Sequence, residues 1–378
     1  MKIAVFTDTF IPNVNGVVTS IVNSSKKLAE RGHEIFIFTV KPKIKKRVDL
    51  NKNIHVFYYP SVSLFKYPDF SLAMPKPIEL TTIIRKIKPD IIHIHTPGLL
   101  GINALAIGLF LKIPVIGTYH TLLPDFLKYV PLPKINTSEA LNRFTWSYTR
   151  NFYNRCNLVI TPSIAMKKEL KKNKIKKKII FLSNGVDLKK FHPIKTKKTG
   201  TKILHVGRVG YEKNIDILLK SFKELSKTNK KAELIIAGDG PDMQRLKDYA
   251  KELNISKKVK FIGIIPNSEL PNLYNSADLF ATASTIETEG IVILEAMACG
   301  LPIVGVNKMA VPSLVKDNKN GFITEPGNTK EIADSMNALL SNKKLRIRMG
   351  NESLKVVNDF SLESTIRKLS ILYTQIRK

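Results

Sequence analysis

The chain has 378 residues, of which 43% are hydrophobic, so it is long enough for two domains of ordinary size, each with its own core. Its formal net charge is +30, and residues 1–193, with 31 basic and 11 acidic side chains, carry +20 of it. Such an excess favours anionic partners, either nucleic acid or an acidic membrane surface, although a lysine-rich proteome would produce the same excess.

Residues 1–120 alternate predicted strands with predicted helices, which indicates a doubly wound parallel sheet. The segment 2–6 is typical of a buried strand rather than a secretory signal, and a loop with Asn15 and Gly16 leads from it into a helix. Further strands are predicted at 34–39, 55–59 and 113–120, and helices at 77–86 and 99–111. The longest apolar run, 98–111, is shorter than the roughly 20 residues of a membrane-spanning helix, so we expect a soluble chain or one bound at a membrane surface.

Three histidines stand near the ends of predicted strands, where ligands gather in sheets of this kind. His93 and His95 alternate along one strand, and a metal pair is conceivable there, but no third ligand follows at a useful spacing. His120 ends the next strand just after Gly117. In isolation it is most simply interpreted as a buried core histidine.

Three segments of the first domain could meet a membrane. Phe65, Tyr67 and Phe70 lie beside a lysine in a proline-bounded loop, which suits a membrane interface as well as packing under the loop. Residues 127–157 are rich in aromatic and basic side chains, part of which must pack against the sheet. The run 166–178 holds eight lysines and is either a solvated helix and turn or a patch facing lipid headgroups, where each charge adds on the order of 1 kcal/mol.

The polar segment 193–200 is typical of a linker between domains. We therefore predict an N-terminal domain at 1–193 and a C-terminal domain at 194–357, followed by an amphipathic helix at 358–378.

The C-terminal domain begins with two glycine turns that follow predicted strands. The first turn carries Gly207, Arg208 and Lys213, whose two cations could clamp a diphosphate or could be surface charge. The second turn contains Gly240. The loop around Gly16 and these turns lack the G-x-G-x-x-G spacing of a dinucleotide-binding site, which argues against a dehydrogenase.

The run 284–304, STIETEGIVILEAMACGLPIV, is the strongest candidate site. A predicted strand leads through a polar turn into a helix that begins near Gly290, and the unpaired amides at such a helix start attract phosphate. Glu287 and Glu295, with seven residues between them, can accept hydrogen bonds from hydroxyls. The two acids could equally serve only to complement the helix dipole.

The order Glu287, Gly290, Glu295, then A-M-A-C-G and Pro302 resembles the donor-site signature of retaining glycosyltransferases of the GT-B fold, in family 4. The G-R-x-x-x-E-K-N run at 207–214 is similar to a second element of that family. This resemblance extends over nearly the whole chain. It implies two Rossmann-like doubly wound domains that face a central cleft, with the C-terminal helix at 358–378 crossing back to the N-terminal domain. It also implies an enzyme that moves a hexose from a nucleotide diphosphate sugar.

The resemblance also implies roles for the acids and the helix start. It places Glu287 near the hydroxyls of the donor sugar and Glu295 near the ribose of the nucleotide. The backbone at Gly290 and Ile291 then faces the diphosphate. These residues form the donor site that the family implies.

Further residues follow from the same resemblance. Arg208 and Lys213 hold the diphosphate in place of a divalent metal ion, so neither a metal nor a cofactor beyond the donor is expected. Gly16 and Gly240 approach the donor through their backbone. His120, in a Tyr-His-Thr turn, contacts the donor sugar near the reaction centre.

Asn15 and Asp125 are the predicted acceptor-binding residues. The elements H-T-P-G-L-L-G and Y-H-T are similar to those of lipid glycosyltransferases that make glucosyldiacylglycerol. We therefore expect UDP-glucose as donor, 1,2-diacylglycerol as acceptor, and a cytoplasmic protein at the anionic inner face of the cell membrane. A phosphatidylinositol, soluble or polysaccharide acceptor with GDP-mannose or another donor is the alternative. Nucleic-acid binding is the remote one, because no base-reading module is apparent.

Overall fold

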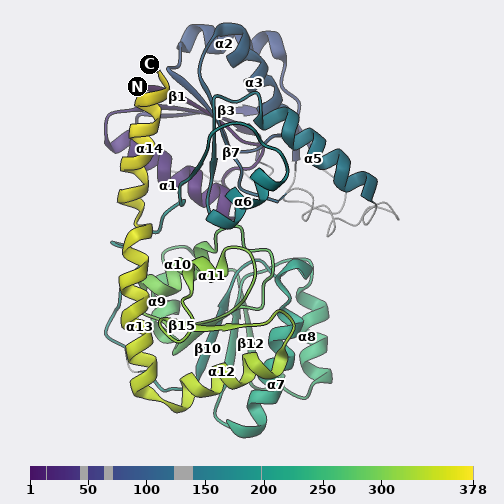
Figure 1. Cartoon of the computed structure of the whole chain (residues 1–378), viewed down its shortest axis with the longest axis vertical. Coiled ribbons are helices and arrows are strands. Elements are labelled where there is room, and N and C mark those ends of the chain that lie inside the picture. The colour runs from purple at the N-terminus through teal and green to yellow at the C-terminus, as the bar shows by residue number, and fades with distance from the viewer. Residues whose placement is uncertain (14, 43–49, 64–70, 123–138, 197, 378) are drawn as a thin grey trace. The chain divides into compact units, whose positions relative to one another are not determined.

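The computed structural model describes residues 1–13, 15–42, 50–63, 71–122, 139–196 and 198–377. The chain divides into two compact units, the first made of residues 1–184 and 362–378 and the second of residues 185–361. The domain boundaries predicted from the sequence lie at 193 and 357. Each unit contains its own parallel sheet with helices (Figure 1), which confirms the predicted α/β fold class.

The first unit is built on a seven-stranded sheet in the order β3-β2-β1-β6-β7-β8-β9, with every neighbouring pair parallel. The strands are β1 (Lys2–Phe6), β2 (Glu34–Val40), β3 (Ile54–Tyr59), β6 (Ile91–Ile94), β7 (Val115–Thr118), β8 (Leu158–Thr161) and β9 (Ile179–Phe181). The helices are α1 (Gly16–Glu30), α2 (Pro77–Ile87), α3 (Leu99–Leu111), α5 (Glu139–Tyr153), α6 (Ile164–Lys172) and α14 (Leu362–Arg377). A short antiparallel pair, β4 (Ser61–Ser63) and β5 (Ser71–Ala73), accompanies them.

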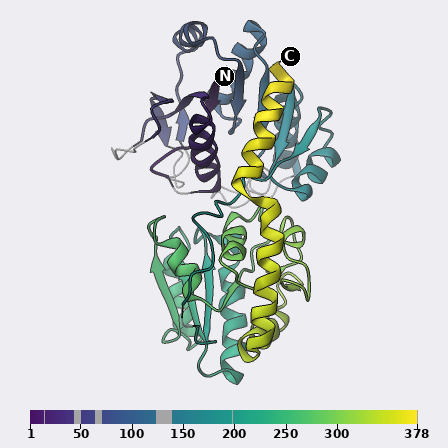
Figure 2. The same cartoon turned by 90° about the vertical axis from the view of Figure 1, so that its left-hand side faces the viewer.

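Helix α14 is the last element of the chain, yet it packs into the core of the first unit beside α1 (Figure 2). Its apolar face follows helical spacing and buries Leu362, Ile366, Leu369 and Tyr373 against residues of the sheet. Ion pairs mark both ends of the helix: Arg31 contacts Glu363 at 2.7 Å and Arg377 contacts Asp90 at 3.0 Å. The first unit therefore needs this distant segment to complete its core.

The second unit is built on a six-stranded parallel sheet in the order β12-β11-β10-β13-β14-β15. The strands are β10 (Lys202–Val206), β11 (Glu233–Ala237), β12 (Val259–Gly263), β13 (Leu279–Ala281), β14 (Ile303–Val306) and β15 (Gly321–Thr324). The α-helices are α7 (Ile215–Thr228), α8 (Met243–Glu252), α9 (Leu270–Ser276), α10 (Ile291–Ala298), α11 (Val311–Leu314), α12 (Thr329–Ser341) and α13 (Lys343–Val357). Two 3-10 turns, η1 (Tyr211–Lys213) and η2 (Asn358–Phe360), complete it.

Both sheets reverse their strand order beside their first strand. In the first unit the chain builds outward from β1 to β3 and then crosses to β6 on the other side of β1. In the second it builds from β10 to β12 and then crosses to β13. Loops that leave the carboxyl ends of the two strands at such a reversal diverge, and the crevice between them is where ligands bind in open α/β sheets.

Within the described ranges, no helix combines the length and the hydrophobicity that crossing a bilayer requires.

Candidate functional site

In the second unit, the strand reversal brings together the loop after β10 and the loop after β13. The first loop carries Arg208 and Lys213, and the second carries Glu287. The Nζ atom of Lys213 donates a hydrogen bond to Oε1 of Glu287 over 2.6 Å, although the two residues are 74 positions apart in the sequence. The basic element at 207–214 and the acidic loop with Glu287 therefore lie in contact in the folded chain.

This ion pair is mostly sheltered from solvent, with side-chain exposures of 19% for Lys213 and 11% for Glu287. Burial acts to raise the pKa of Glu287, but the charge and hydrogen bond of Lys213 outweigh it, and the pKa lies below its ordinary value. Glu287 is therefore an ionised acceptor at neutral pH.

Asn214 ties the same two loops together from the start of α7. Its backbone is left-handed, with φ of 49°, and its side-chain amide donates to Thr285 Oγ1 at 3.1 Å and to the Ala283 carbonyl at 3.3 Å. Sequence reasoning gave Asn214 no role of its own. The G-R-x-x-x-E-K-N pattern, in which it follows Lys213, contained the signal.

Glycines allow the loops after β10 and β11 to pack backbone against backbone. A Cβ atom on Gly240 would lie 2.3 Å from the Val209 carbonyl oxygen, and one on Gly238 would lie 1.8 Å from the Gly207 carbonyl oxygen. The Val209 amide also donates to the Asp239 carbonyl at 2.9 Å. The structure thus places Gly240 against the loop that carries Arg208, and Arg208 itself is half-buried there.

Helix α10 begins at Ile291, directly after Gly290, near which the sequence predicts the start of a helix. Gly290 has a left-handed backbone with φ of +84°, and among the described residues no side chain caps this end of the helix. The first helical residue, Ile291, is half-buried. This geometry leaves the amino end of α10, four residues after Glu287, with the unpaired amides that bind anions.

Glu295 lies one turn further along α10 and is buried, with 7% of its surface exposed. Burial raises its pKa to about 7, while the Tyr274 hydroxyl, which donates to Oε2 at 2.8 Å, and the charge of Lys190 lower it in part. The two glutamates of the motif therefore differ: Glu287 is held ionised, and Glu295 titrates near neutrality. Only the folded environment distinguishes them.

In the first unit, Asn15 and Gly16 start α1. The Asn15 side chain accepts a hydrogen bond from the Val18 amide at 3.0 Å, so it is the N-cap of the helix, and it donates to Thr9 Oγ1 at 3.1 Å. Gly16 is exposed in the first turn. Asp125, the other predicted acceptor-binding residue, lies outside the described residues.

His120 lies two residues beyond β7 and is buried, with 7% exposed. Its Nε2 is 2.8 Å from Nδ1 of His95, a pairing that sequence reasoning missed because it considered His95 only with His93. The two nitrogens of His93 contact the Tyr373 hydroxyl and Thr118 Oγ1, each at 2.6 Å. The conceivable His93–His95 metal pair is therefore replaced by two separate hydrogen-bonded arrangements.

Asp8, which sequence reasoning also missed, occupies the strand reversal of the first unit. It follows β1, and its Oδ2 accepts a hydrogen bond from Thr96 Oγ1 at 2.6 Å, which joins the loops after β1 and β6. Burial raises the pKa of Asp8 to about 6. The residue lies against the amino end of α3 at Gly98.

Comparison with known proteins identifies the family. Residues 14–190 match the family model described as Glycosyltransferase Family 4, and residues 186–356 match the model of Glycosyl transferases group 1. Alpha-monoglucosyldiacylglycerol synthase of Streptococcus pneumoniae is 33% identical to this chain over 337 residues, which cover 85% of the chain and 75% of the relative. The chain belongs to the group 1 and family 4 glycosyltransferases. It is a hexosyltransferase that uses a nucleotide sugar.

Other relatives of the glycosyltransferase differ in their named sugars and acceptors. The alpha-monoglucosyldiacylglycerol synthase of Acholeplasma laidlawii is 30% identical, covering 85% of this chain and 84% of the relative. A GDP-mannose-dependent alpha-mannosyltransferase of Corynebacterium glutamicum is 27% identical, covering 88% and 78%. Among solved structures, sucrose-phosphate synthase from Thermosynechococcus elongatus matches with a TM-score of 0.82 at 19% identity, covering 99% of this chain and 98% of that one. That likeness supports the GT-B fold.

No cluster of three His, Cys, Asp or Glu side chains that could hold a metal ion occurs in the described part of the glycosyltransferase. Arg208 and Lys213 follow β10, one of the two strands at the reversal.

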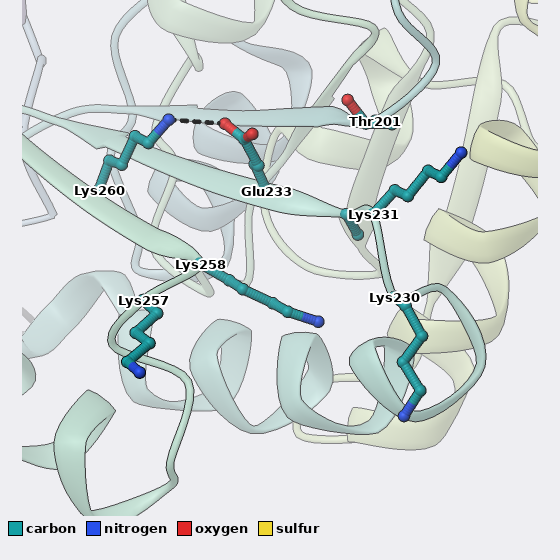
Figure 3. Close-up of a pocket in the computed structure, with 8 residues that line it drawn as sticks. Thr201, Lys230, Lys231, Glu233, Lys257, Lys258 and Lys260 are labelled. Carbon is teal, nitrogen blue, oxygen red and sulfur yellow. Dashed lines mark hydrogen bonds and ion pairs between the residues drawn. The ribbon is translucent and has the colours of Figure 1, made fainter.

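A lysine-lined pocket lies at the opposite end of the second sheet, where β10, β11 and β12 begin (Figure 3). Lys260 pairs with Glu233 at 2.8 Å, while the labelled side chain of Lys231 points away from that of Lys230. Because ligands bind at the carboxyl ends of parallel strands, this pocket is separate from the candidate site.

Proposed function

We propose that this glycosyltransferase moves glucose from UDP-glucose to 1,2-diacylglycerol at the membrane surface, with retention of the anomeric configuration and without a metal ion. The observation that carries the proposal is the Lys213–Glu287 pair at 2.6 Å. It puts a cation, and a carboxylate that can accept hydrogen bonds from hydroxyls, where the loops of the second sheet diverge. Similarity to two proteins named alpha-monoglucosyldiacylglycerol synthase, at 33% and 30% identity, supports the choice of sugar and acceptor.

The leaving diphosphate is the group that these charges stabilise. As the bond between sugar C1 and the phosphate oxygen breaks, negative charge develops on the diphosphate. Arg208, Lys213 and the amides at Gly290 and Ile291 meet that charge without reorganising. The acceptor hydroxyl attacks C1 from the face that the diphosphate leaves, and the diphosphate oxygen takes its proton. A new C1–O bond to the acceptor forms with retained configuration.

The remaining residues orient the donor. Glu287 accepts hydrogen bonds from sugar hydroxyls, and Glu295 accepts them from the ribose. Gly16 and Gly240 allow close backbone approach. His120 contacts the donor sugar.

The acceptor and the membrane are recognised by the first unit in this proposal, with Asn15 and Asp125 on the acceptor side. Seven lysines in and after α6 are exposed: Lys168, Lys171, Lys172, Lys174, Lys176, Lys177 and Lys178. Phe144 on α5, 68% exposed, lies next to the exposed Arg143, while Trp146 and Phe152 of the same helix are buried. Lysines and an exposed aromatic ring suit the anionic inner face of the cell membrane.

The test is a transfer assay with chelator present. The purified chain is incubated with UDP-glucose or GDP-mannose and with phosphatidylglycerol vesicles that contain diacylglycerol, phosphatidylinositol or neither. Nucleotide release and glycolipid are both measured, and Glu287→Ala is the site control. We expect glucosyldiacylglycerol from UDP-glucose only, lost in the variant. Mannolipid from GDP-mannose would establish the alternative donor. Nucleotide release without glycolipid would move the acceptor to a soluble sugar or polymer, and no release from either donor would contradict the proposal.

The role of the lysines is tested with two variants of equal charge change. The first variant replaces Lys171, Lys172 and Lys177 of the first unit with Glu. The control variant replaces Lys230, Lys231 and Lys257 of the Figure 3 pocket with Glu. We expect vesicle binding and glycolipid formation to fall in the first variant alone. Equal loss in both would show that only net charge matters.

A further inference from the structure

His95 and His120 form a buried imidazole pair at the carboxyl edge of the first sheet. His95 follows β6 and is 6% exposed, and His120 follows β7 and is 7% exposed. Nδ1 of His95 lies 2.8 Å from Nε2 of His120, and the rings stack with centroids 5.1 Å apart and planes 16° apart. Both the contact and the stacking fix the relative orientation of the two rings.

The neighbouring His93 holds this pair without sharing its hydrogen bond. Both nitrogens of His93 contact hydroxyls, those of Tyr373 on α14 and Thr118 on β7, at 2.6 Å each. Its ring centroid lies 4.2 Å from that of His95. His93 is therefore anchored on two elements and packs against His95, whose Nδ1 is directed to His120 instead.

Both members of the pair are neutral at physiological pH. Burial lowers the pKa of His120 to about 3 and the pKa of His95 well below its ordinary value. Two neutral imidazoles at hydrogen-bond distance share one hydrogen. If it resides on His120 Nε2, then His120 Nδ1 is an acceptor; if it resides on His95 Nδ1, then His120 Nδ1 is a donor.

We propose that His95 is a positioning residue of the transferase: it holds the His120 imidazole in one orientation and in one tautomer, and so decides whether His120 offers the donor sugar a hydrogen-bond donor or an acceptor. This inference rests on the proposed contact between His120 and the donor sugar. It adds to that function the residue that determines the hydrogen-bonding state of His120.

The test compares His95→Asn with His95→Gln. The Asn amide reaches about the position of the imidazole Nδ1, and the Gln amide reaches about that of Nε2, so the two variants match in chemistry and differ in where a hydrogen bond can form. We expect His95→Asn to keep most of the wild-type kcat. We expect His95→Gln to lose about 10- to 100-fold in kcat, by analogy with the loss seen when the hydrogen-bond partner that orients a metal-ligating histidine is removed.

A spectroscopic measurement of the His120 tautomer complements the kinetic assay. Side-chain 15N NMR of histidine-labelled protein at pH 7, with the His120 signals assigned from a His120→Gln sample, reports which nitrogen carries the hydrogen. We expect one tautomer of His120 in the wild type and in His95→Asn, and a mixture in His95→Gln. Because this spectrum needs no turnover, it decides the inference even if no donor is used and the proposed function fails.

Three results would overturn the inference: equal kcat in both variants, two tautomers of His120 in the wild type, or an unchanged tautomer in His95→Gln. Thermal unfolding shows whether each variant is folded. If His95→Gln does not fold, the wild-type spectrum and the kcat of His95→Asn decide. Two tautomers of His120 in the wild-type spectrum, or a large loss of kcat in His95→Asn, would then contradict the role of His95.

Discussion

The Nζ atom of Lys213 lies 2.6 Å from Oε1 of Glu287, and this contact joins the loops that leave β10 and β13 on either side of the strand reversal. The ionised form of Glu287 depends on Lys213, because burial alone would raise the pKa of Glu287 and favour its neutral form. In the proposed mechanism Lys213 also contacts the donor diphosphate. The positive charge of Lys213 would then stabilise both the Glu287 carboxylate and the leaving diphosphate.

Removing this cation should affect both stability and turnover. We expect Lys213→Met to raise the pKa of Glu287, to lower the free energy of unfolding at pH 7 by about 1–3 kcal/mol, and to lower kcat/KM by about 100-fold or more. Urea unfolding and steady-state kinetics measure the two effects. Lys213→Arg keeps the charge and should retain stability. Wild-type kcat/KM in Lys213→Met would remove Lys213 from the proposed donor site.

Glu295 should make stability depend on pH. Its ordinary pKa is 4.5 and its folded value is about 7, so between these values the folded state binds more protons than the unfolded state. Stability from this residue is therefore complete below pH 4.5, falls as pH rises and levels off above pH 7, a change of about 3–4 kcal/mol. The side chain of Glu295→Gln does not titrate, so the unfolding free energy of this variant minus that of the wild type should increase from pH 5 to pH 8. Urea unfolding at several pH values measures this difference. A difference that does not change with pH would contradict the raised pKa.

The turn at Gly238, after β11, should tolerate no side chain. Gly238→Ala combines φ of +134° with a Cβ atom 1.8 Å from the Gly207 carbonyl oxygen, so we expect a loss of at least about 3 kcal/mol in unfolding free energy and weaker nucleotide binding. Gly327→Ala is the matched control, with φ of +81° and no atom within 4 Å of the added Cβ, and should cost about 1–2 kcal/mol. Equal losses in denaturant unfolding would show that backbone strain, rather than the contact with Gly207, dominates.

Helix α14 should be essential to the first unit. Ile366 is fully buried in the core of that unit, and Ile366→Ala should lower the unfolding free energy by about 2–5 kcal/mol. Ile371 on the same helix is 51% exposed, and Ile371→Ala should change the unfolding free energy by less than about 0.5 kcal/mol. Both are measured by chemical denaturation. Similar small effects would mean that α14 packs less firmly than its burial indicates.

Much of the fold was predictable because strands and helices leave local patterns. Short apolar runs followed by amphipathic segments indicated both parallel sheets, and Gly290 marked the start of α10. Asn15 shows the limit of such reasoning. The sequence places it in the loop before α1, whereas its cap hydrogen bond to Val18 and its contact with Thr9 depend on coordinates.

By itself, the sequence determined the α/β class, the family, and the presence of Glu287, Glu295, Arg208 and Lys213 in the expected motifs, because these are properties of residue order and spacing. Only the tertiary structure decided how those residues differ. Burial sets the pKa of Glu295 to about 7, whereas Lys213 holds Glu287 ionised. The pairing of His95 with His120 likewise requires β6 and β7 to lie side by side. Such contacts join residues far apart in the chain, and the desolvation that shifts a pKa exists only once the chain has folded around it.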